Sequence, residues 1–343
     1  MDRVLERVLV WGAGAVGGTV GAHLVRAGHE VTFVDVDAGQ VAIIADTARG
    51  LAVTGPVDAF RVSAPAFVPE ALEGTWDTVL LCVKAQASMM ACLSLARHLT
   101  PEGYVVSLQN GLCERVISAI VGQGRTVGAC INFGADMAGP GTVLYGGRGA
   151  FVLGELDGTV TPRVQAVHAM VRDAFEPGAI LTDEIDGYVW GKLAIAVLLF
   201  AQATGEASVG ACLARPELLP LWRALAGEVL AVAEAVGVRA RGVDGFDPAA
   251  FGPGATEDAA RASIAAMAAF HGGSARLHGG AWRDLAVHHR RTEVDVQLLP
   301  VVMEGGSYGV ETPMCRKLVK MVHEAEEGGR AQSDANLVEL LEG

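Results

Sequence analysis

The chain has 343 residues, of which 51% are hydrophobic and 19% charged, so it is long enough to form two domains with separate cores. Its formal net charge of −13 at pH 7 argues against a nucleic-acid partner and against an anionic membrane surface, which both attract basic proteins. We therefore expect a few local cations to bind any anionic substrate.

The six cysteines show neither a C-x-x-C pair nor the spacing of metal ligands, and several lie in apolar runs. This pattern is typical of reduced, buried thiols in the cytosol. The N-terminus leads directly into a predicted strand, and the longest apolar run, 193–203, is too short to span a bilayer. The sequence thus predicts a cytoplasmic protein with no metal site, no signal peptide and no membrane contact.

The first predicted strand, at 8–11, runs into a glycine-rich turn that leads to a predicted helix at 19–26. The turn reads G-x-G-x-x-G. Its first glycine permits a tight turn, its second lets the backbone approach a pyrophosphate, and its third lets helix and strand pack closely, while the helix N-terminus presents N–H groups to the phosphates. The segment therefore predicts a dinucleotide site. The residues expected to contact the dinucleotide here are Gly12, Gly14, Ala15, Val16 and Gly17.

Asp35 closes a second predicted strand, at 30–35, about 20 residues past the glycines. An acidic side chain at this position can accept hydrogen bonds from the adenosine ribose hydroxyls and would repel a 2′-phosphate. The sequence therefore favours NAD over NADP, although either cofactor is compatible with the glycine turn. The alternative is that Asp35 and Asp37 merely begin a polar loop.

The remainder of the first half alternates strands and helices, a pattern that favours a doubly wound parallel sheet. Strands are predicted at 51–53, 60–62, 76–83, 103–109 and 126–133, with a continuation of the sheet at 142–153, and helices at 86–99 and 114–122. We assign residues 1–181 to a Rossmann-type α/β domain that binds the dinucleotide.

Beyond about residue 182 the apolar periodicity is helical throughout. Helices are predicted at 184–203, 216–236, 256–270, 280–303 and 313–326. We assign residues 182–343 to an all-helical C-terminal domain that carries substrate-binding and catalytic residues. The polar end from Gly328 onward is expected to be loosely held.

Two polar residues stand at the carboxyl ends of predicted parallel strands, where ligands of open α/β sheets bind. Lys84 follows the strand at 76–83, and Asn110 follows the strand at 103–109. Both are therefore candidates for the cofactor cleft. The alternatives are a solvated charge and an ordinary Asn-Gly turn.

Lys192 is the only charged residue between Asp186 and Glu206. Apolar residues share its face of the predicted helix, so its ammonium must snorkel, find a partner or face a cavity. In a cavity it could donate a proton to a carbonyl oxygen as hydride reaches the carbon. Snorkelling to solvent is the main alternative.

Glu293 is a candidate partner for Lys192, because a nearby carboxylate would hold that lysine charged. It falls in the predicted helix 280–303 between residues expected to point inward, whereas Asp295 lies far around the helix and is expected to be solvated. On spacing alone, Glu293 could equally belong to a solvated charged face.

Taken together, these residues resemble the ketopantoate reductase (2-dehydropantoate 2-reductase) family over about residues 7–325. The segments that carry the resemblance, in family order, are Gly12-x-Gly14-x-x-Gly17, Val83-Lys84-Ala85, Gln109-Asn110-Gly111, the Pro140-Gly-Thr-Val stretch leading to Gly154-Glu155, Trp190-x-Lys192-Leu-Ala, Thr292-Glu293-x-Asp295 and Gly309-Val-Glu-Thr-Pro313. The resemblance implies that Lys192 is the general acid and that Glu293 assists it. It further implies that Lys84 and Asn110 contact cofactor and substrate.

Three departures from the family pattern bear on the substrate. Ala196 and Phe200 stand where the family carries substrate-binding asparagines, and the segment 277–282 lacks the usual serine but adds His278 and Trp282. The interval from Asp284 to Glu293 is also about one residue longer than expected. Loss of hydrogen-bonding side chains makes the predicted pocket more apolar than one built for ketopantoate. Asp35 likewise departs from the family's usual use of NADP.

The sequence therefore predicts an oxidoreductase that transfers hydride from a nicotinamide cofactor to the carbonyl of a small 2-oxo acid. Ketopantoate is the best single named substrate, and a bulkier or more apolar 2-oxo acid used with NAD, as in a D-2-hydroxyacid dehydrogenase, is the alternative. A 6-phosphogluconate-type dehydrogenase is disfavoured because Lys192-Leu-Ala-Ile195 lacks that class's Lys-x-x-Asn. A non-catalytic sensor that binds NAD is the alternative from another functional class. The sequence is compatible with a homodimer.

Overall fold

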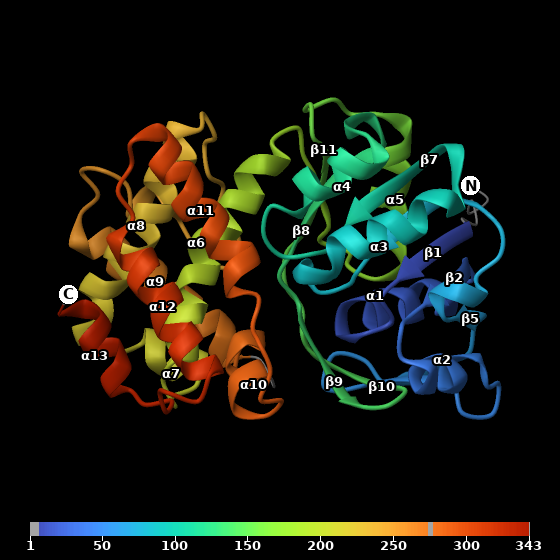
Figure 1. Ribbon diagram of the computed structural model, residues 1–343, viewed down its shortest axis with the longest axis horizontal. Helices are drawn as coiled ribbons and strands as arrows, with labels where there is room; N and C mark the ends of the chain where they lie inside the picture. The colour runs from blue at the N-terminus through green and yellow to red at the C-terminus, as the bar shows by residue number, and fades with distance from the viewer. Residues whose placement is uncertain (1–6, 274–276, 343) are drawn as a thin grey trace. The chain divides into compact units, whose positions relative to one another are not determined.

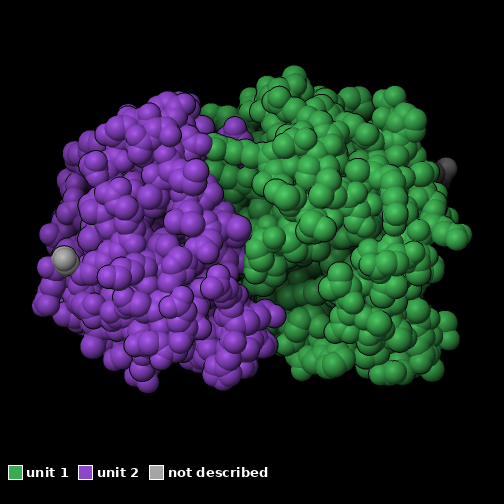
Figure 2. Space-filling model, in the orientation of Figure 1, with its two compact units in different colours: residues 1–185 green, residues 186–343 purple. Residues whose placement is uncertain are grey.

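The computed structural model describes residues 7–273 and 277–342. The chain divides into two compact units, residues 1–185 and residues 186–343 (Figure 2). The division thus falls just inside the first turn of a long helix, a few residues beyond position 181, where the strand pattern of the sequence ends.

Unit 1 is built on an eight-stranded sheet in the order β12-β11-β8-β7-β6-β1-β2-β5 (Figure 1). The strands are β1 (Arg7–Trp11), β2 (Glu30–Val34), β5 (Ala66–Phe67), β6 (Trp76–Leu81), β7 (Leu99–Ser107), β8 (Thr126–Ile131), β11 (Phe151–Glu155) and β12 (Ile180–Leu181). Neighbouring strands pair in parallel except β8 and β11, which are antiparallel. The chain winds outward from β1 to β2 and then returns to add β6 on the other side of β1, so the strand order reverses between β1 and β6.

Five α-helices connect these strands: α1 (Ala15–Arg26), α2 (Ala38–Ala45), α3 (Ser88–Leu95), α4 (Cys113–Val121) and α5 (Pro162–Ala174). Short 3₁₀ helices lie at Pro69–Ala71, Ala85–Ala87, Ala96–His98 and Gln123–Arg125. Local signals begin two of the α-helices. The Asp37 side chain accepts hydrogen bonds from the first backbone N–H groups of α2, and Thr161 does the same for α5, which starts with a proline.

A second, four-stranded sheet in the order β4-β3-β10-β9 belongs to the same unit. Its strands are β3 (Leu51–Thr54), β4 (Phe60–Val62), β9 (Gly134–Gly139) and β10 (Thr142–Gly147). The sequence predicted a continuation of the sheet at 142–153, and the chain forms two strands there, β10 in this sheet and then β11 in the main sheet. Hydrogen bonding explains the break, because β10 pairs with β3 and β9 whereas β11 pairs with β8 and β12.

Unit 2 is helical, and its described residues contain no strand. The helices are α6 (Ile185–Ala203), α7 (Val209–Leu213), α8 (Leu219–Ala235), α9 (Glu257–Gly272), α10 (Gly280–Ala286), α11 (Val294–Tyr308), α12 (Pro313–Glu326) and α13 (Ala335–Leu341), with 3₁₀ turns at Pro216–Leu218 and Pro248–Ala250 (Figure 1). By length and composition α6 is apolar enough to cross a membrane, but 72% of it is buried inside the molecule, as in a core helix. The predicted fold class, a Rossmann-type sheet domain followed by a helical domain, is confirmed.

The predicted continuous helix at 280–303 is wrong, because α10 ends at Ala286 and α11 begins only at Val294. His289 has a φ of +48°, which no helix interior allows. The buried carboxylate of Asp284 accepts from Arg290 Nη2 at 2.7 Å and from its Nε at 2.8 Å, and this pairing folds the segment back on α10. The helical face on which Glu293 was expected to point inward therefore does not exist.

The C-terminal end is also better held than its polar sequence suggests. Leu337 and Leu340 of α13 are fully buried, and Asn336 Nδ2 donates to the carbonyl of Thr204 at 2.8 Å. Arg330 binds the carboxylates of Glu324 and Glu339, both at 2.7 Å. Buried leucines, a buried hydrogen bond and two ion pairs therefore hold a segment whose composition is mostly polar.

Candidate functional site

The glycine-rich turn lies between β1 and α1, at the point where the strand order of the main sheet reverses. Gly12 has a φ of +101°, and a side chain there would come within 2.8 Å of the backbone nitrogen of Val83. A Cβ on Gly17 would lie 1.9 Å from the Gly12 carbonyl oxygen, so the start of α1 can pack closely on the turn. Gly14, in contrast, has no atom within 4 Å of the position its Cβ would take. Two of the glycines are required by the protein itself, whereas the space beside Gly14 is open.

The N-terminus of α1 has no side-chain cap and no acidic residue in its first turn. Its free backbone N–H groups, at the start of Ala15–Arg26, lie next to the open space at Gly14. Such a terminus is a ready site for phosphate oxygens, and an acid in the first turn would oppose them. The residues present therefore fit the pyrophosphate of a dinucleotide.

Asp35 lies directly after β2 and is half-buried. Its Oδ2 accepts a hydrogen bond from the backbone N–H of Ala13 at 2.7 Å, and its Oδ1 accepts from Asp37 N–H at 2.9 Å. The carboxylate thus joins the end of β2 to the glycine turn. Because an ionised carboxylate has about four acceptor positions, Asp35 keeps acceptor capacity for ribose hydroxyls.

Lys84 and Asn110 follow the neighbouring parallel strands β6 and β7, at the same edge of the sheet as the glycine turn. Lys84 is exposed and Asn110 is half-buried. The Gln109 side chain, which is buried, ties the two strand ends together by donating from Nε2 to the Val83 carbonyl and to Ser88 Oγ, both at 2.8 Å. The sequence showed Gln109 only as part of the motif Gln109-Asn110-Gly111 and did not predict this role. The one indication in the sequence was its position next to Asn110.

Unit 1 thus brings the predicted cofactor residues to one edge of its sheet, at the carboxyl ends of β1, β2, β6 and β7. Ligands of open α/β sheets bind at this edge, next to the point of reversal. The residues placed there are Gly12, Gly14, Ala15, Val16, Gly17, Asp35, Lys84 and Asn110.

Lys192 lies in the second turn of α6, in unit 2. Most of α6 is fully buried, but Tyr188, Lys192, Ala196 and Leu199 form one half-buried stripe along it. On another side of the helix, Gly191 allows a backbone segment to approach, because its Cβ would lie 1.8 Å from the Arg241 carbonyl oxygen. Lys192 is therefore held on a well-packed helix with an otherwise uncharged stripe around it.

Glu293 immediately precedes α11 and is 7% exposed, so the protein buries this carboxyl group. The preceding residue is anchored, since Glu326 Oε1 accepts from both the backbone N–H (2.7 Å) and the hydroxyl (2.8 Å) of Thr292. Asp295, which was expected to be solvated, keeps 45% of its side chain exposed and also pairs with His323 Nε2 at 2.6 Å. Glu293 thus stands at a fixed helix start rather than inside a helix.

The departures from the family pattern that bear on the substrate lie in unit 2. Ala196 is half-buried on the Lys192 stripe, and Phe200 is buried. His278 stacks on Trp282 with ring centroids 3.7 Å apart, and Trp282 Nε1 donates to the Gly205 carbonyl at 3.0 Å. Burial lowers the pKa of His278, aided by the nearby charge of Arg283.

Across the described residues, no group of three or more His, Cys, Asp or Glu side chains could hold a metal ion.

Two family models match the chain in order. The model described as "Ketopantoate reductase PanE/ApbA" matches residues 8–158, and the one described as "Ketopantoate reductase PanE/ApbA C terminal" matches residues 184–326. Together they span the glycine turn and both strand-end residues in unit 1, and Lys192 and Glu293 in unit 2.

Individual proteins are similar over nearly the whole chain. A 2-dehydropantoate 2-reductase from Archaeoglobus fulgidus is 28% identical over 325 residues, covering 94% of this chain and 99% of that protein. The crystal structure of a PanE/ApbA family ketopantoate reductase from Ralstonia eutropha matches with a TM-score of 0.77 at 27% identity, covering 94% and 98% of the two chains. D-mandelate dehydrogenase with NADH and anilino(oxo)acetate shares the fold, with a TM-score of 0.79 at 21% identity and coverage of 94% and 98%.

Proposed function

The chain belongs to the ketopantoate reductase PanE/ApbA family, and we propose that it reduces the carbonyl of a small 2-oxo acid, with 2-dehydropantoate to pantoate as the best named reaction. It is an NAD(P)-dependent oxidoreductase acting on a CH–OH group. The observation that supports the proposal most directly is the open space at Gly14 beside the uncapped start of α1.

When bound, the nicotinamide cofactor supplies hydride to the substrate carbon. The chain's own residues hold it: the N–H groups at the start of α1 bind the pyrophosphate, and Lys84 and Asn110 position the nicotinamide ribose and the substrate. Gln109 keeps these last two aligned, because its hydrogen bonds fix the ends of β6 and β7 against each other.

Lys192 is the proposed general acid, donating a proton from Nζ to the carbonyl oxygen as the alcohol forms. Glu293 is its proposed partner, since a carboxylate near an ammonium favours the charged, proton-bearing form of the lysine. The burial of Glu293 supports this role, because a carboxylate excluded from water is costly unless a donor or a cation compensates it.

The choice between ketopantoate and a more apolar 2-oxo acid depends on Ala196 and Phe200. Neither side chain can hydrogen-bond a hydroxyl or a carboxylate. A site with these residues therefore has little preference for a hydroxylated 2-oxo acid such as ketopantoate over one without a hydroxyl. This favours, as the alternative, a D-2-hydroxyacid dehydrogenase activity on a bulkier or more apolar 2-oxo acid. The fold accommodates such chemistry, as the D-mandelate dehydrogenase that shares it illustrates.

Asp35 supports NAD as the preferred cofactor. Its carboxylate lies at the end of β2, and the three residues after it, Val36, Asp37 and Ala38, supply no cation for a 2′-phosphate. A protein that only senses NAD is the alternative from another class, and it would bind the cofactor without turnover.

The test is a matrix of initial rates with ketopantoate and with an aromatic 2-oxo acid, each against NADH and NADPH. Turnover of ketopantoate supports the named reaction, whereas turnover restricted to the aromatic acid with NADH supports the alternative. No turnover in any of the four combinations, with cofactor still bound, would favour the sensor and contradict the proposal.

The role of Lys192 is tested with Lys192→Met on the substrate that turns over. We expect kcat to fall by about 10²–10⁴-fold, the usual contribution of a general acid, while the Kd for NADH changes little. Lys320→Gln is the matched control, because Lys320 is an exposed lysine on α12 in the same unit. A Lys192→Met variant that keeps its kcat would remove the lysine from the mechanism.

A further inference from the structure

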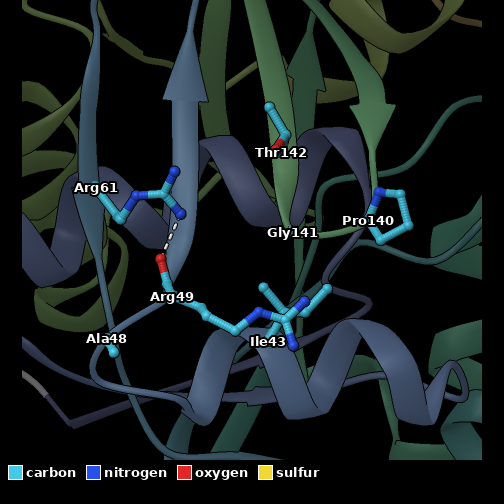
Figure 3. Close-up of a pocket in the computed structure, with 7 residues that line it drawn as sticks. All are labelled: Ile43, Ala48, Arg49, Arg61, Pro140, Gly141 and Thr142. Carbon is cyan, nitrogen blue, oxygen red and sulfur yellow. Dashed lines mark hydrogen bonds between the residues drawn. The ribbon is translucent and has the colours of Figure 1, made fainter.

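A cavity in unit 1 is lined by residues outside the glycine turn. It has a volume of about 390 Å³ and opens between the chain that follows α2, the strand β4, and the turn that joins β9 to β10 (Figure 3). Arg49 and Arg61 line one side of it, and Gly141 and Thr142 line the other. The proposed function assigns no role to any of these residues.

The cavity carries two guanidinium groups without a paired acid. Within the described residues, neither Arg49 nor Arg61 forms an ion pair, although the chain has a net charge of −13. The nearest acids along the chain are occupied elsewhere: Asp46 Oδ1 accepts from the N–H groups of Ala48 and Arg49, and Asp58 binds Arg26 at 2.6 Å. The positive charge of the cavity is therefore not neutralised by its surroundings.

Arg61 is also held in place. Its Nη1 donates to the carbonyl oxygens of Arg49 and Gly50, the latter at 3.1 Å, which leaves its other N–H groups for a ligand. Guanidinium forks match the oxygens of phosphate in paired hydrogen bonds, and the Thr142 hydroxyl adds a donor on the facing side (Figure 3). A phosphoryl group uses three or four donors, whereas a lone carboxylate would leave part of this set unused.

One buried side chain connects this cavity to the glycine turn. Gln40 in α2 is 4% exposed, and its Oε1 accepts from the Gly141 N–H at 2.7 Å while its Nε2 donates to the Ala13 carbonyl at 2.9 Å. Gly141 lines the cavity, and Ala13 lies between Gly12 and Gly14. A ligand that fixes the Gly141 turn therefore fixes, through two hydrogen bonds, the loop that receives the dinucleotide.

We propose that the cavity bounded by Arg49, Arg61 and Thr142 binds a phosphoryl anion, either free phosphate or a phosphorylated metabolite, and that its occupancy tightens dinucleotide binding through Gln40. The coupling is reciprocal, so the dinucleotide tightens phosphate binding by the same factor.

The site is tested by calorimetric titration of the full-length protein with inorganic phosphate and with glycerol 3-phosphate, at ionic strength matched with KCl. We expect Arg49→Gln to weaken binding about tenfold, since it removes a charge-assisted hydrogen bond. Arg172→Gln is the matched control, as it removes an exposed arginine on α5 of the same unit and should leave binding unchanged. Equal affinity in the wild type and Arg49→Gln, or equal loss in both variants, overturns the site. If inorganic phosphate binds more tightly, the ligand is free phosphate. If glycerol 3-phosphate binds more tightly, the ligand is a phosphorylated metabolite.

The coupling is tested by the Kd for NADH, read from nicotinamide fluorescence without turnover. Phosphate should lower this Kd about fivefold in the wild type and leave it unchanged in Gln40→Met. A rise in Kd would mean that phosphate competes at the glycine turn, which contradicts the proposal. Weaker binding of NADPH but not NADH in Arg49→Gln would place the cavity in the cofactor site and also overturn it. None of these readouts depends on which 2-oxo acid is reduced.

Discussion

At the scale of single residues, the glycine motif separates into positions where the fold requires glycine and a position where the fold leaves room for a side chain. Gly17 allows the start of α1 to touch the Gly12 carbonyl, whereas Gly14 borders open space. A sequence motif cannot distinguish these demands, because all three positions read as glycine.

We therefore predict different outcomes for Gly14→Ala and Gly17→Ala. The Gly17 variant should lose about 1–3 kcal/mol of stability, since its methyl group would overlap backbone, while the Gly14 variant should melt like the wild type. Both should bind NADH more weakly. Thermal melts together with fluorescence titrations check this, and a Gly14 variant with wild-type affinity would mean that the pyrophosphate does not approach there.

The structural role of Asp35 can be separated by substitution from its proposed role in cofactor selection. Asp35→Asn keeps an oxygen for the Ala13 N–H, gives up the hydrogen bond from the exposed Asp37 N–H and removes the negative charge. The ratio of the NADPH and NADH dissociation constants should therefore shift about tenfold toward NADPH, with little change in melting temperature. An unchanged ratio would show that the carboxylate does not select against the 2′-phosphate.

At the scale of elements, α1 is anchored by a buried histidine in its last turn, away from the glycine turn where the helix begins. The His23 Nδ1–H donates to the Thr19 carbonyl at 2.7 Å, and the ring packs against those of Phe60, Tyr145 and Phe175. Burial lowers the pKa of His23, and burial also raises the pKa of Tyr145 to about 12. The helix that begins at the glycine turn is thus packed against an imidazole that burial keeps in its neutral form.

This arrangement predicts a pH dependence of stability. Because the pKa of His23 is lower in the folded protein than its unfolded value near 6.5, the unfolded state takes up a proton first as pH falls. The contribution of neutral His23 to the free energy of unfolding is therefore fully present above about pH 6.5. It is lost as the pH falls below this value, with a slope of at most about 1.4 kcal/mol per pH unit. The charge of Arg26 acts in the same direction, while that of Asp58 opposes it.

Urea unfolding at pH 7.5 and pH 5.5 measures this effect. The loss of stability between the two values should be smaller in His23→Gln than in the wild type, and His288→Gln, which changes an exposed histidine, should behave like the wild type. If His23→Gln loses as much stability as the wild type, the imidazole is not the titrating group. Asp58, whose pKa is lowered by Arg26, contributes only in more acidic solution.

At the scale of the whole molecule, the two units have separate cores, and the thiols are divided between them. Cysteines 82, 92, 113 and 130 belong to unit 1, and cysteines 212 and 315 belong to unit 2. Five of the six are buried, and burial raises the pKa of Cys92 to about 11 and that of Cys212 to about 12. Alkylation of the buried thiols at pH 8 should therefore require local opening of their own unit.

We predict that NADH protects the thiols of the two units differently. At about 100 times its Kd, the cofactor stabilises the unit that binds it by about 2.7 kcal/mol, which corresponds to roughly 100-fold slower labelling through the open state. Peptide mass spectrometry should find this slowing at Cys92, Cys113 and Cys130 but not at Cys212 or Cys315. Equal protection of all five would show that the units open together.

The sequence by itself determined the family, the order of domains and most strands and helices, because periodicity and turn residues are local properties. Sequence reasoning also singled out Gly14, Asp35, Lys84 and Asn110, since strand ends are recognisable along the chain and parallel strands share one edge. Lys192 was visible as a lone charge in an apolar helix.

Tertiary structure decided what depends on contacts between distant segments. The pairing of Asp284 with Arg290 broke a predicted helix and placed Glu293 at a helix start, although the local periodicity continued through it. Hydrogen-bond partners divide the segment 142–153, predicted as a continuation of the sheet, between two sheets. The link from Gly141 through Gln40 to Ala13 spans 128 residues, so no local pattern could have revealed it.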